Sequence, residues 1–581
     1  MGKLPEFTSV KDIRYGHTPS LDAWLLHFMT ENNLDYSIDP QKNASPEQVS
    51  FMVPLEENQV FAPCSERVLR LLLSARLDPE LKAEYNTKWR ALSYLVHNYV
   101  SDPYLRKRIL GLCRYKHRLV RASSIIIPSR LMKRYITIFL TQSGLVDPFR
   151  GLKRRFNAQA LAAIESGMLD ALLDFCPDES MGCSRLSDLR FDLDMLEMER
   201  LLVLSTTSGI WEETRPKPVF EELKRNEFGS RANLERLNQV FMSGREKPMK
   251  ILYLPDTSGG LMFDLLLVRA LLRQGHRVVL ALKEGFYFGT PTFWDWEGDP
   301  ALAKFLEGAR FLPEDKISKN ELLKAQRENP FLVISDGTRE ELNLYRASVT
   351  FARAWKESDL ILAKGDPHHR RLIQTGRSFT RDILCFYRDR QNQFNLDFKS
   401  KPESVKKFSE QGLLAKADEI IKAKRQAKAE GKSVMFYSAI IGSLPEQTGT
   451  AIQVMDVFVR YLRTRLEKTF IINPAEHFEE GMDADDLMFM WEKVQRSGLI
   501  DVWRFQTVED IEKSFELMGS KIPPIWTGKD STFSTGCTKE MRIALDMQAR
   551  FPEMQIIGPN PEKFFRRLEY GVGKFSDVVF D

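Results

Sequence analysis

Short apolar runs alternate with helical segments in the second half of the chain, and this alternation limits the fold more than any other feature. From about residue 246, the runs MKILYLP, HRVVLAL, FLVIS and DLILAK have the length of strands, and helical sequence lies between them. Strands and helices that alternate in this way form a mainly parallel sheet covered by helices. The sequence therefore predicts the α/β fold class.

The pattern of apolar and charged residues divides the chain into four regions. Residues 1–245 are predicted to be mostly helical, and residues 246–395 are predicted to form the α/β core. Residues 396–432 are rich in charge and are expected to be a solvent-facing helical connector. In residues 433–581 the strand–helix alternation resumes, as a second α/β region or as a continuation of the first sheet.

Composition is that of a globular protein. The 581 residues are 43% hydrophobic and 28% charged, and the formal net charge is only +4, so the whole chain is not a polycation built for nucleic acid. Six cysteines are too sparse for a disulfide scaffold, and we expect free thiols. We find neither a secretory signal nor a run long enough to span a membrane. These features predict a cytoplasmic protein without a membrane partner.

Between residues 104 and 155 the chain is rich in Arg and Lys and holds a single acid, Asp147. A basic face for nucleic acid is one interpretation. The apolar residues among the basic ones favour the other interpretation, in which the helices pack on one side and face solvent on the other. We therefore do not expect nucleic acid as a partner.

The strongest local signal is the turn PDTSGG (255–260), which lies between an apolar strand and a helix. Asp256 follows the carboxyl end of the strand, where ligands bind in open parallel sheets. The turn Thr257-Ser258-Gly259-Gly260 and the start of the helix favour an anion such as phosphate, and a carboxylate there suits a hard cation. The alternative is an ordinary helix cap.

A second candidate is TPTFWDWEGDP (290–300), which follows the second strand of the core. Asp295 is predicted to be a second oxygen ligand of the cation held by Asp256. Asp299 directly precedes a proline, and we interpret it as a turn residue.

A third candidate is the segment ILAKGDPHHRRL (361–372), in which a strand ends at Lys364. A mobile lysine beside a helix N-terminus is suited to holding a phosphoryl group. Asp366 is predicted to cap the helix and to lie in the ligand-binding region. His368 and His369 are adjacent, so they face different directions and are not expected to be a metal-binding pair.

Other turns are weaker candidates. Asp336 and Gly337 follow another strand, and Glu476 and His477 follow a strand of the C-terminal region. A loop rich in Gly, Ser and Thr precedes a helix near the C-terminus. The residues that could form a ligand loop there are Lys529, Asp530, Thr535, Gly536 and Cys537.

Three of these segments together resemble the metal-dependent damage-control phosphatases, the family grouped with acidic-residue methyltransferase-like proteins. PDTSGG resembles the family's Asp-Asn-x-Gly turn, Asp295 its later metal-binding Asp, and ILAKGD its Lys-Gly-Asp strand end. Upstream, DPFRGLKRRFN (147–157) is similar to the family's Asp-Pro-Tyr…Lys…Asn segment. The resemblance runs from about residue 145 to 375.

The resemblance implies a three-layer α/β/α core with a helical N-terminal region, and hydrolysis of phosphorylated small metabolites. It also implies a divalent metal (manganese, nickel, cobalt or magnesium) held by Asp256 and Asp295, with Thr257 in the place of the usual Asn. Lys364 would contact phosphate, and the backbone around Ser258 and Gly259 would cradle its oxygens.

The chain departs from the family pattern at two positions of the turn. Thr257 offers a hydroxyl where the family has an amide, and Leu261 stands where an acid often follows the Gly of the turn. Asp264 lies one helical turn further on and is not expected to reach the site.

Two other functions fit the sequence. An S-adenosylmethionine-dependent carboxyl methyltransferase would use Gly259 and Gly260 in the turn and Glu284 for a ribose. A non-catalytic protein that binds a phosphorylated ligand is the other alternative, and the altered turn favours it.

Overall fold

The computed structural model describes residues 10–34, 37–38, 40, 50–51, 58–74, 76–167, 169, 184–212, 217–245, 247–441, 443–444, 447–479 and 481–566. The chain divides into two compact units, Met1–Glu403 and Ser404–Asp581. Each has its own sheet. The α/β fold class predicted from the sequence is confirmed.

The first part of the first unit is helical. Its longer helices are α1 (Pro19–Asn32), α4 (Glu66–Leu72), α5 (Pro79–Tyr99), α6 (Pro103–Ser123), α7 (Pro128–Ser143), α8 (Arg150–Glu165), α10 (Ser184–Ser205), α11 (Gly209–Glu212), α12 (Lys217–Asn226) and α13 (Arg231–Phe241). Asp-Pro pairs begin two of them. The carboxylates of Asp78 and Asp102 accept hydrogen bonds from backbone N–H groups in the first turns of α5 and α6, and proline occupies the next position.

A seven-stranded sheet forms the core of the first unit. Its strands are β1 (Lys250–Leu254), β2 (Arg277–Leu282), β3 (Arg310–Leu312), β4 (Phe331–Ser335), β5 (Leu360–Lys364), β6 (Asp382–Arg388) and β7 (Phe394–Lys399). The strand order is β3-β4-β2-β1-β5-β6-β7, and every neighbouring pair is parallel except β6 and β7. Strand β1 is central, so the turn that follows it lies in the middle of the carboxyl edge.

Helices connect the strands of this sheet. They are α14 (Gly260–Arg273), α15 (Pro300–Phe305), α16 (Lys319–Glu328), α17 (Val349–Glu357) and the short α18 (Asp366–His368), which a single turn of π-helix, His369–Ile373, extends. Gly275 ends α14 with a φ of +85°, as a helix terminator does.

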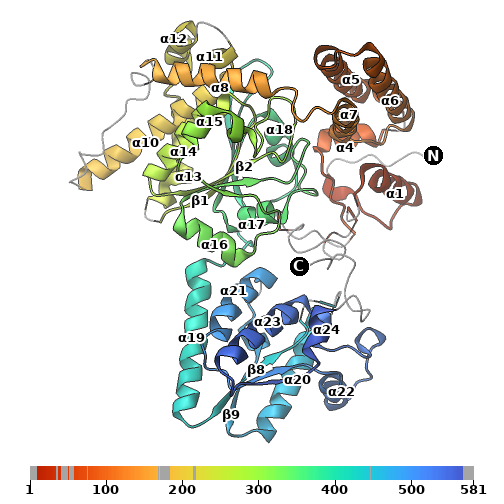
Figure 1. Ribbon diagram of the computed structural model, residues 1–581, viewed down its shortest axis with the longest axis vertical. Helices are drawn as coiled ribbons and strands as arrows, with labels where there is room; N and C mark the ends of the chain where they lie inside the picture. The colour runs from red at the N-terminus through yellow and green to blue at the C-terminus, as the bar shows by residue number, and fades with distance from the viewer. Residues whose placement is uncertain are drawn as a thin grey trace. The chain divides into compact units, whose positions relative to one another are not determined.

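Alternate residues of β1 face two separate apolar cores. Ile251 and Tyr253 pack with α10, α13 and α14 on one face of the sheet, whereas Leu252 and Leu254 pack with α16, α17 and the N-terminal helices on the other. Both faces of the sheet are therefore covered, as Figure 1 shows for the first unit. This is a three-layer α/β/α arrangement.

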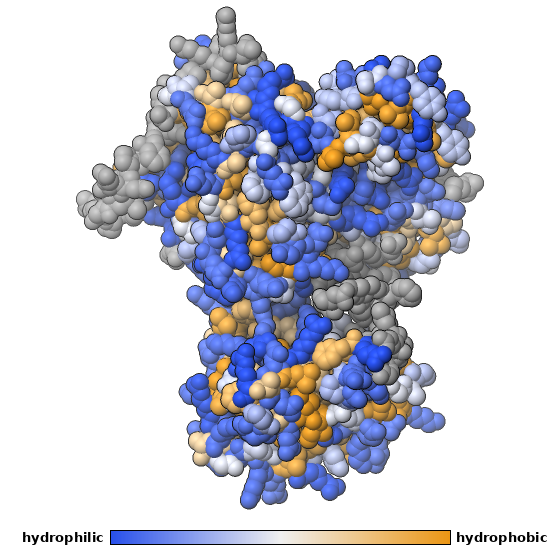
Figure 2. Space-filling view, in the orientation of Figure 1, coloured by the Kyte–Doolittle hydropathy of each residue, from blue (hydrophilic) through white to orange (hydrophobic). Residues whose placement is uncertain are grey.

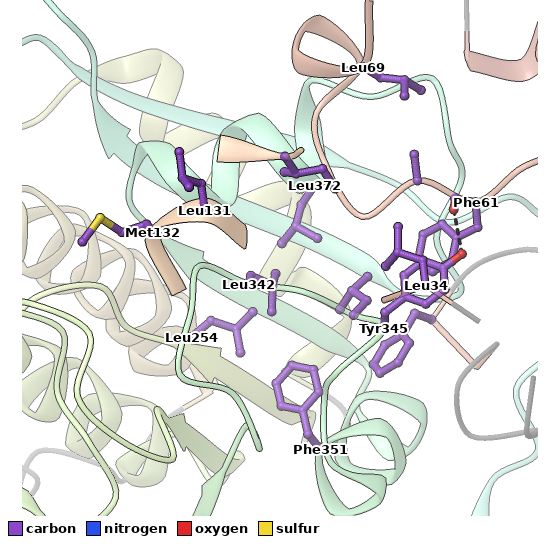
Figure 3. Close-up of a cluster of buried hydrophobic side chains, with 14 of the residues drawn as sticks. Leu34, Phe61, Leu69, Leu131, Met132, Leu254, Leu342, Tyr345, Phe351 and Leu372 are labelled. Atoms are coloured by element: carbon purple, nitrogen blue, oxygen red, sulfur yellow. Dashed lines mark hydrogen bonds between the residues drawn. The ribbon is translucent and has the colours of Figure 1, made fainter. Parts of the chain in front are cut away.

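The N-terminal helices and loops pack directly onto the sheet layer. Figure 3 shows Leu34, Phe61 and Leu131 converging with Leu254 and Tyr345 in one buried apolar cluster. The Tyr345 hydroxyl donates a hydrogen bond to the carbonyl oxygen of Phe61 at 2.6 Å, and the two rings stack. The helical N-terminal region is thus part of the same folded unit as the sheet.

The second unit has a four-stranded parallel sheet in the order β11-β10-β8-β9. Its strands are β8 (Ser433–Ser438), β9 (Thr469–Ile472), β10 (Val502–Phe505) and β11 (Gln555–Ile557). Its helices are α19 (Glu410–Ala429), α20 (Thr448–Arg465), α21 (Ala484–Gln495), α22 (Val508–Leu517), α23 (Thr535–Arg550) and α24 (Pro561–Phe565). The C-terminal α/β region therefore has a separate sheet and does not continue the first one.

Residues 396–432, for which the sequence predicts a connector, contribute to both units. Residues 396–399 belong to β7 of the first sheet, and α19 covers the second sheet, to which it contributes Leu413, Ala417 and Ile420 as buried residues. In the described part of the chain, none of the helices has the length and apolar character needed to cross a membrane.

Candidate functional site at the carboxyl edge of the first sheet

Lys364 lies at the centre of the candidate site. Strand β5 ends at this residue, beside β1, and its ammonium reaches across to the turn that follows β1. Lys364 Nζ lies 3.2 Å from Asp256 Oδ1 and 3.1 and 2.9 Å from the two oxygens of Asp264. The side chains of Lys364 and Asp264 are 1% and 0% exposed, whereas that of Asp256 is partly exposed, at 26%. The site is thus a buried ion pair with one carboxylate that faces solvent.

This geometry corrects two expectations. Asp264, which was not expected to reach the site, contacts Lys364 directly because α14 begins immediately after the turn and directs this residue back toward β5. Lys364 is not mobile, because two carboxylates hold its ammonium.

Burial and charge act against each other in this ion pair. Burial alone would lower the pKa of Lys364, but Asp264 and Asp256 outweigh it and raise the pKa. Burial raises the pKa of Asp264 to about 6, although Lys364 opposes this shift. Lys364 is therefore charged at neutral pH.

Glycines allow the close approach of these segments. Gly259 has a φ of +84°, and a Cβ there would lie 2.4 Å from the Trp211 ring. A Cβ on Gly260 would lie 2.5 Å from Lys364 Nζ, and one on Gly365 would lie 2.6 Å from Asp256 Oδ2. The ammonium and the carboxylate thus occupy space that any other residue would fill.

Two backbone amides of the turn PDTSGG are hydrogen-bonded to other segments of the first unit. The amide of Ser258 donates to the carbonyl oxygen of Gly289 at 2.8 Å, and the amide of Gly259 donates to Asn157 Oδ1 at 2.6 Å. These two amides are therefore already hydrogen-bonded within the protein. The Ser258 hydroxyl, in contrast, is buried and has no hydrogen-bond partner among the residues that the structure describes. Thr257 Oγ1 donates to Asp256 Oδ1 at 3.0 Å.

Asp295 lies in the loop after β2 and is also paired with a lysine. Lys153 Nζ, from α8, lies 3.1 Å from Asp295 Oδ2 and 2.8 Å from Asp147 Oδ2. The amide and hydroxyl of Thr292 donate to the Asp295 carboxylate at 2.9 and 2.7 Å. Both oxygens of Asp295 thus have partners.

Asn157, one helical turn beyond Lys153, joins this loop to the turn after β1. Its amide nitrogen donates to Asp299 Oδ2 at 2.8 Å, and its oxygen accepts from Gly259. Asp299 also caps α15, where it accepts hydrogen bonds from two backbone amides. The segment DPFRGLKRRFN therefore positions both candidate loops.

Asp366 is the first residue of α18, and Gly365 takes the N-cap position in its place. The predicted capping role of Asp366 is therefore wrong. Its partly exposed carboxylate pairs with Arg370 at 2.6 Å. His368 Nδ1 contacts the carbonyl oxygen of Lys364, and His369 Nε2 lies 3.1 Å from Asp397, so the two histidines face different partners.

A small pocket lies along the same edge. It is lined by Pro255, Thr290, Lys283, Asp336 and His368, among others. Lys283 Nζ lies 2.6 Å from Asp336 Oδ2, and both residues are buried. Burial lowers the pKa of His368 to about 4, so this histidine is neutral.

The donors at this edge suit a hard cation, though not as a complete protein cage. Among the described residues, no group of three or more His, Cys, Asp or Glu side chains could hold a metal. The Asp256 carboxylate and the adjacent Thr257 hydroxyl are oxygen donors of the kind that a Mg²⁺-type ion takes, since this ion binds one or two carboxylates and keeps several waters. The unpartnered Ser258 hydroxyl is a further polar group in the turn.

The weaker candidates have structural partners. Glu284 pairs with Arg339, and Glu476 pairs with Arg463. In the loop before α23, Lys529 lies over the Phe533 ring, Asp530 caps a short 3-10 helix, and Ser534 caps α23. The four described cysteines, Cys64, Cys113, Cys385 and Cys537, are free thiols, whereas Cys176 and Cys183 lie outside the described residues.

Sequence reasoning missed Asp264, Lys283 and the role of Lys153. Asp264 is the only acid in the apolar helix GLMFDLLLVRALL, and a buried acid requires a cationic partner. Lys283 directly follows an apolar strand, much as Lys364 ends one. These signals were present in the sequence.

Comparisons with known proteins place the chain in a family. No curated protein matches it. Among solved structures, a DUF89 family protein from Pyrococcus horikoshii is 19% identical, with a TM-score of 0.35, and the match covers 54% of this chain and 92% of that one. The model of the damage-control phosphatase ARMT1-like domain matches residues 63–389, more than half of the chain and beyond both ends of the resemblance seen in its motifs. The chain therefore belongs to the damage-control phosphatase ARMT1-like domain family.

Proposed function

We propose that this protein is a metal-dependent phosphatase that hydrolyses phosphorylated small metabolites at the carboxyl edge of the first sheet. The observation that carries the proposal is the contact between Lys364 Nζ and Asp256 Oδ1, 3.2 Å apart, at the start of α14. It brings together two loops that lie more than 100 residues apart in the sequence. Family membership supports the same reaction class.

Phosphoryl transfer depends mainly on positioning and on stabilising negative charge. Three lysines lie at this edge, Lys364, Lys153 and Lys283, each paired with one or two carboxylates, and the N-terminal end of α14 adds a partial positive charge. Lys364 would stabilise the phosphoryl oxygens, and Asp264 would hold Lys364 in place and charged. The partly exposed Asp256 and the hydroxyl of Thr257 would face the ligand.

Asp256, Thr257 and Asp295 would hold the divalent cation, which is manganese, nickel, cobalt or magnesium in this proposal. When bound, the cation would polarise the phosphoryl oxygens and reduce the repulsion of an incoming nucleophile. Asp366 would lie at the margin of the ligand-binding region, where it is exposed beside Arg370.

The test is phosphate release from p-nitrophenyl phosphate and a panel of sugar phosphates, with each of the four metals in turn. We expect release that a divalent metal stimulates and that Asp256→Ala lowers by roughly 10²-fold or more. Asp418→Ala is the matched control, because it removes an exposed acid of the second unit. Elemental analysis of the purified protein would identify the metal.

The assay also separates the alternatives. Binding of phosphate esters without turnover would support a non-catalytic binding protein, which the paired carboxylates also suit. Binding of S-adenosylmethionine without metal would support a methyltransferase. Either result without phosphate release would contradict our proposal.

A further inference from the structure

Helix α6 carries an apolar stripe on its solvent-facing side. Its buried side is formed by Ile109, Cys113, His117 and Val120, which pack toward α5 and α7. The opposite side has large apolar residues that are unusually exposed. They are Tyr104 at 73%, Leu112 at 45%, Tyr115 at 63% and Leu119 at 47%.

The spacing of these residues makes them one stripe. Leu112, Tyr115 and Leu119 follow one another at intervals of three and four residues, which places them on one face of a helix. Tyr104 lies two turns before Leu112 on the same side. The sequence predicts a solvated face here, and the outer face is exposed, but most of its large side chains are apolar; Arg108 lies among them, four residues from both Tyr104 and Leu112. Figure 2 shows apolar side chains at the surface of the region that holds α5, α6 and α7.

Basic residues border this stripe, Arg108 lies within it, and α6 has no acid at all. The exposed basic residues are Lys107, Arg108, Arg114, Lys116, Arg118 and Arg121. In the described part of the chain, none of the six pairs with an acid. Because the rest of the chain nearly balances its charge, these cations are a local feature.

We propose that the exposed face of α6 is a docking surface for an anionic lipid membrane. Four to eight basic residues on an amphipathic helix attract anionic headgroups, and leucine side chains enter the boundary of the acyl layer. Tyrosine favours the headgroup level of a bilayer. The helix is already folded against α5 and α7, so docking requires no further ordering.

The residue types favour a membrane over other partners. Nucleic acid binds where cations form the centre of a face, but here leucine and tyrosine form most of the centre, and five of the six exposed cations, all but Arg108, lie at its border. Protein interfaces are depleted in lysine and mix charges of both signs, whereas α6 has only positive charges, lysine among them. Charge complementarity thus selects an anionic lipid surface.

The test is sedimentation of the full-length protein with two kinds of vesicle. One consists of phosphatidylcholine alone, and the other contains roughly one-third phosphatidylserine. We expect binding to the second kind only. The double variant Leu112→Ser with Leu119→Ser and the double variant Arg114→Glu with Arg118→Glu should each weaken it by at least about tenfold. All four side chains are exposed, so circular dichroism should be unchanged.

The matched control combines Leu517→Ser with Lys422→Glu, which removes one exposed leucine and one exposed cation from the second unit. It should bind like the natural sequence. Absence of vesicle binding would overturn the proposal. So would binding that needs the arginines but not the leucines, because that is diffuse attraction rather than docking. Binding of a single-stranded oligonucleotide in place of vesicles, lost in the same variants, would assign the face to nucleic acid instead.

Discussion

The carboxyl edges of the two parallel sheets carry different polar chemistry. At the edge of the first sheet, buried lysines pair with carboxylates, as in Lys364 with Asp264 and Lys283 with Asp336. At the edge of the second, neutral groups bond to one another beside an ion pair of Arg504 with the buried Asp510. The backbone N–H of Ile440 donates to Gln506 Oε1 at 3.1 Å, and the Trp503 indole donates to Ser438 Oγ at 2.9 Å.

The difference shows that a buried charge needs a stronger compensating interaction than a buried neutral group does. A buried charge is tolerated only with a partner of opposite sign, whereas a buried amide needs only hydrogen bonds. At the first edge, carboxylates fix the positions of the lysine ammonium groups. The same type of sheet thus carries several buried lysine–carboxylate pairs in one unit, and neutral hydrogen bonds with an Arg504–Asp510 pair in the other.

The largest expected effect is the loss of Lys364. Lys364→Met leaves Asp264 fully buried without its cation, so we expect the free energy of unfolding to fall by about 3–5 kcal/mol. Adding Asp264→Asn should recover part of this loss. In the second sheet, Gln506→Met removes one hydrogen bond to Ile440 and should cost only about 1–2 kcal/mol. Denaturant titration measures all four proteins. Equal losses for Lys364→Met and Gln506→Met would contradict the contrast between the two edges.

The next effect depends on pH and concerns Glu540 in α23. Its carboxyl accepts a hydrogen bond from Gln495 at 2.8 Å, and burial raises its pKa from 4.5 to about 7. The folded state therefore retains a proton that the unfolded state releases at lower pH. This stabilisation is fully present below pH 4.5 and is lost as the pH rises through about 7, by on the order of 3 kcal/mol.

Glu540→Gln keeps the shape of the protonated side chain and cannot ionise. We expect the free energy of unfolding of this variant to decline less between pH 5 and 8 than that of the natural sequence, because residue 540 no longer titrates. Chemical denaturation at several pH values measures both. Parallel curves for the two proteins would show that Glu540 does not titrate in this range.

The third prediction compares the stability cost of replacing two glycines, each of which lies near the start of a helix. Gly259→Ala forces a Cβ against Trp211 at a φ of +84°, and we expect a loss of about 2–3 kcal/mol. Gly536 in α23 has an ordinary φ, and its nearest neighbour would be Ser534 Oγ at 3.4 Å. Gly536→Ala should therefore be neutral or stabilising by up to about 1 kcal/mol. Thermal unfolding of the two variants tests whether close packing is confined to the first edge.

The four runs predicted as strands of the core, MKILYLP, HRVVLAL, FLVIS and DLILAK, form β1, β2, β4 and β5. The prediction missed β3, β6 and β7. Strand β3 has only three residues, and β7 is an antiparallel edge strand that alternates apolar and polar residues in a charged region. Strand β6, in contrast, is a continuous buried apolar run, so its pattern was present in the sequence and was overlooked.

The candidate site was predictable where a polar residue follows a strand directly, as Asp256 and Lys364 do. The contact of Lys364 with Asp264 was not predictable, because Asp264 lies within a helix and its distance from β5 depends on how α14 packs. Asn157 is hydrogen-bonded to Gly259 and Asp299, which lie about 100 and 140 positions further along the chain. Patterns within a short stretch of sequence carry no information about contacts between residues so far apart. The sequence pattern thus predicts which residues lie at the carboxyl edge of the sheet, but not the hydrogen bonds and ion pairs that hold them in place.

The smallest expected effect tests whether burial, rather than charge alone, determines how much an ion pair at this edge contributes to the free energy of unfolding. Asp366 lies only two residues beyond Lys364, but its pair with Arg370 is exposed and spans four residues of one helical segment. Pairs of this kind contribute about 0.3–0.5 kcal/mol. We expect Asp366→Ala to lower the free energy of unfolding by about 0.5 kcal/mol, and a double-mutant cycle with Arg370→Ala to give a coupling of that size. A coupling comparable to the loss in Lys364→Met would mean that the exposed pair is as important to the fold as the buried one.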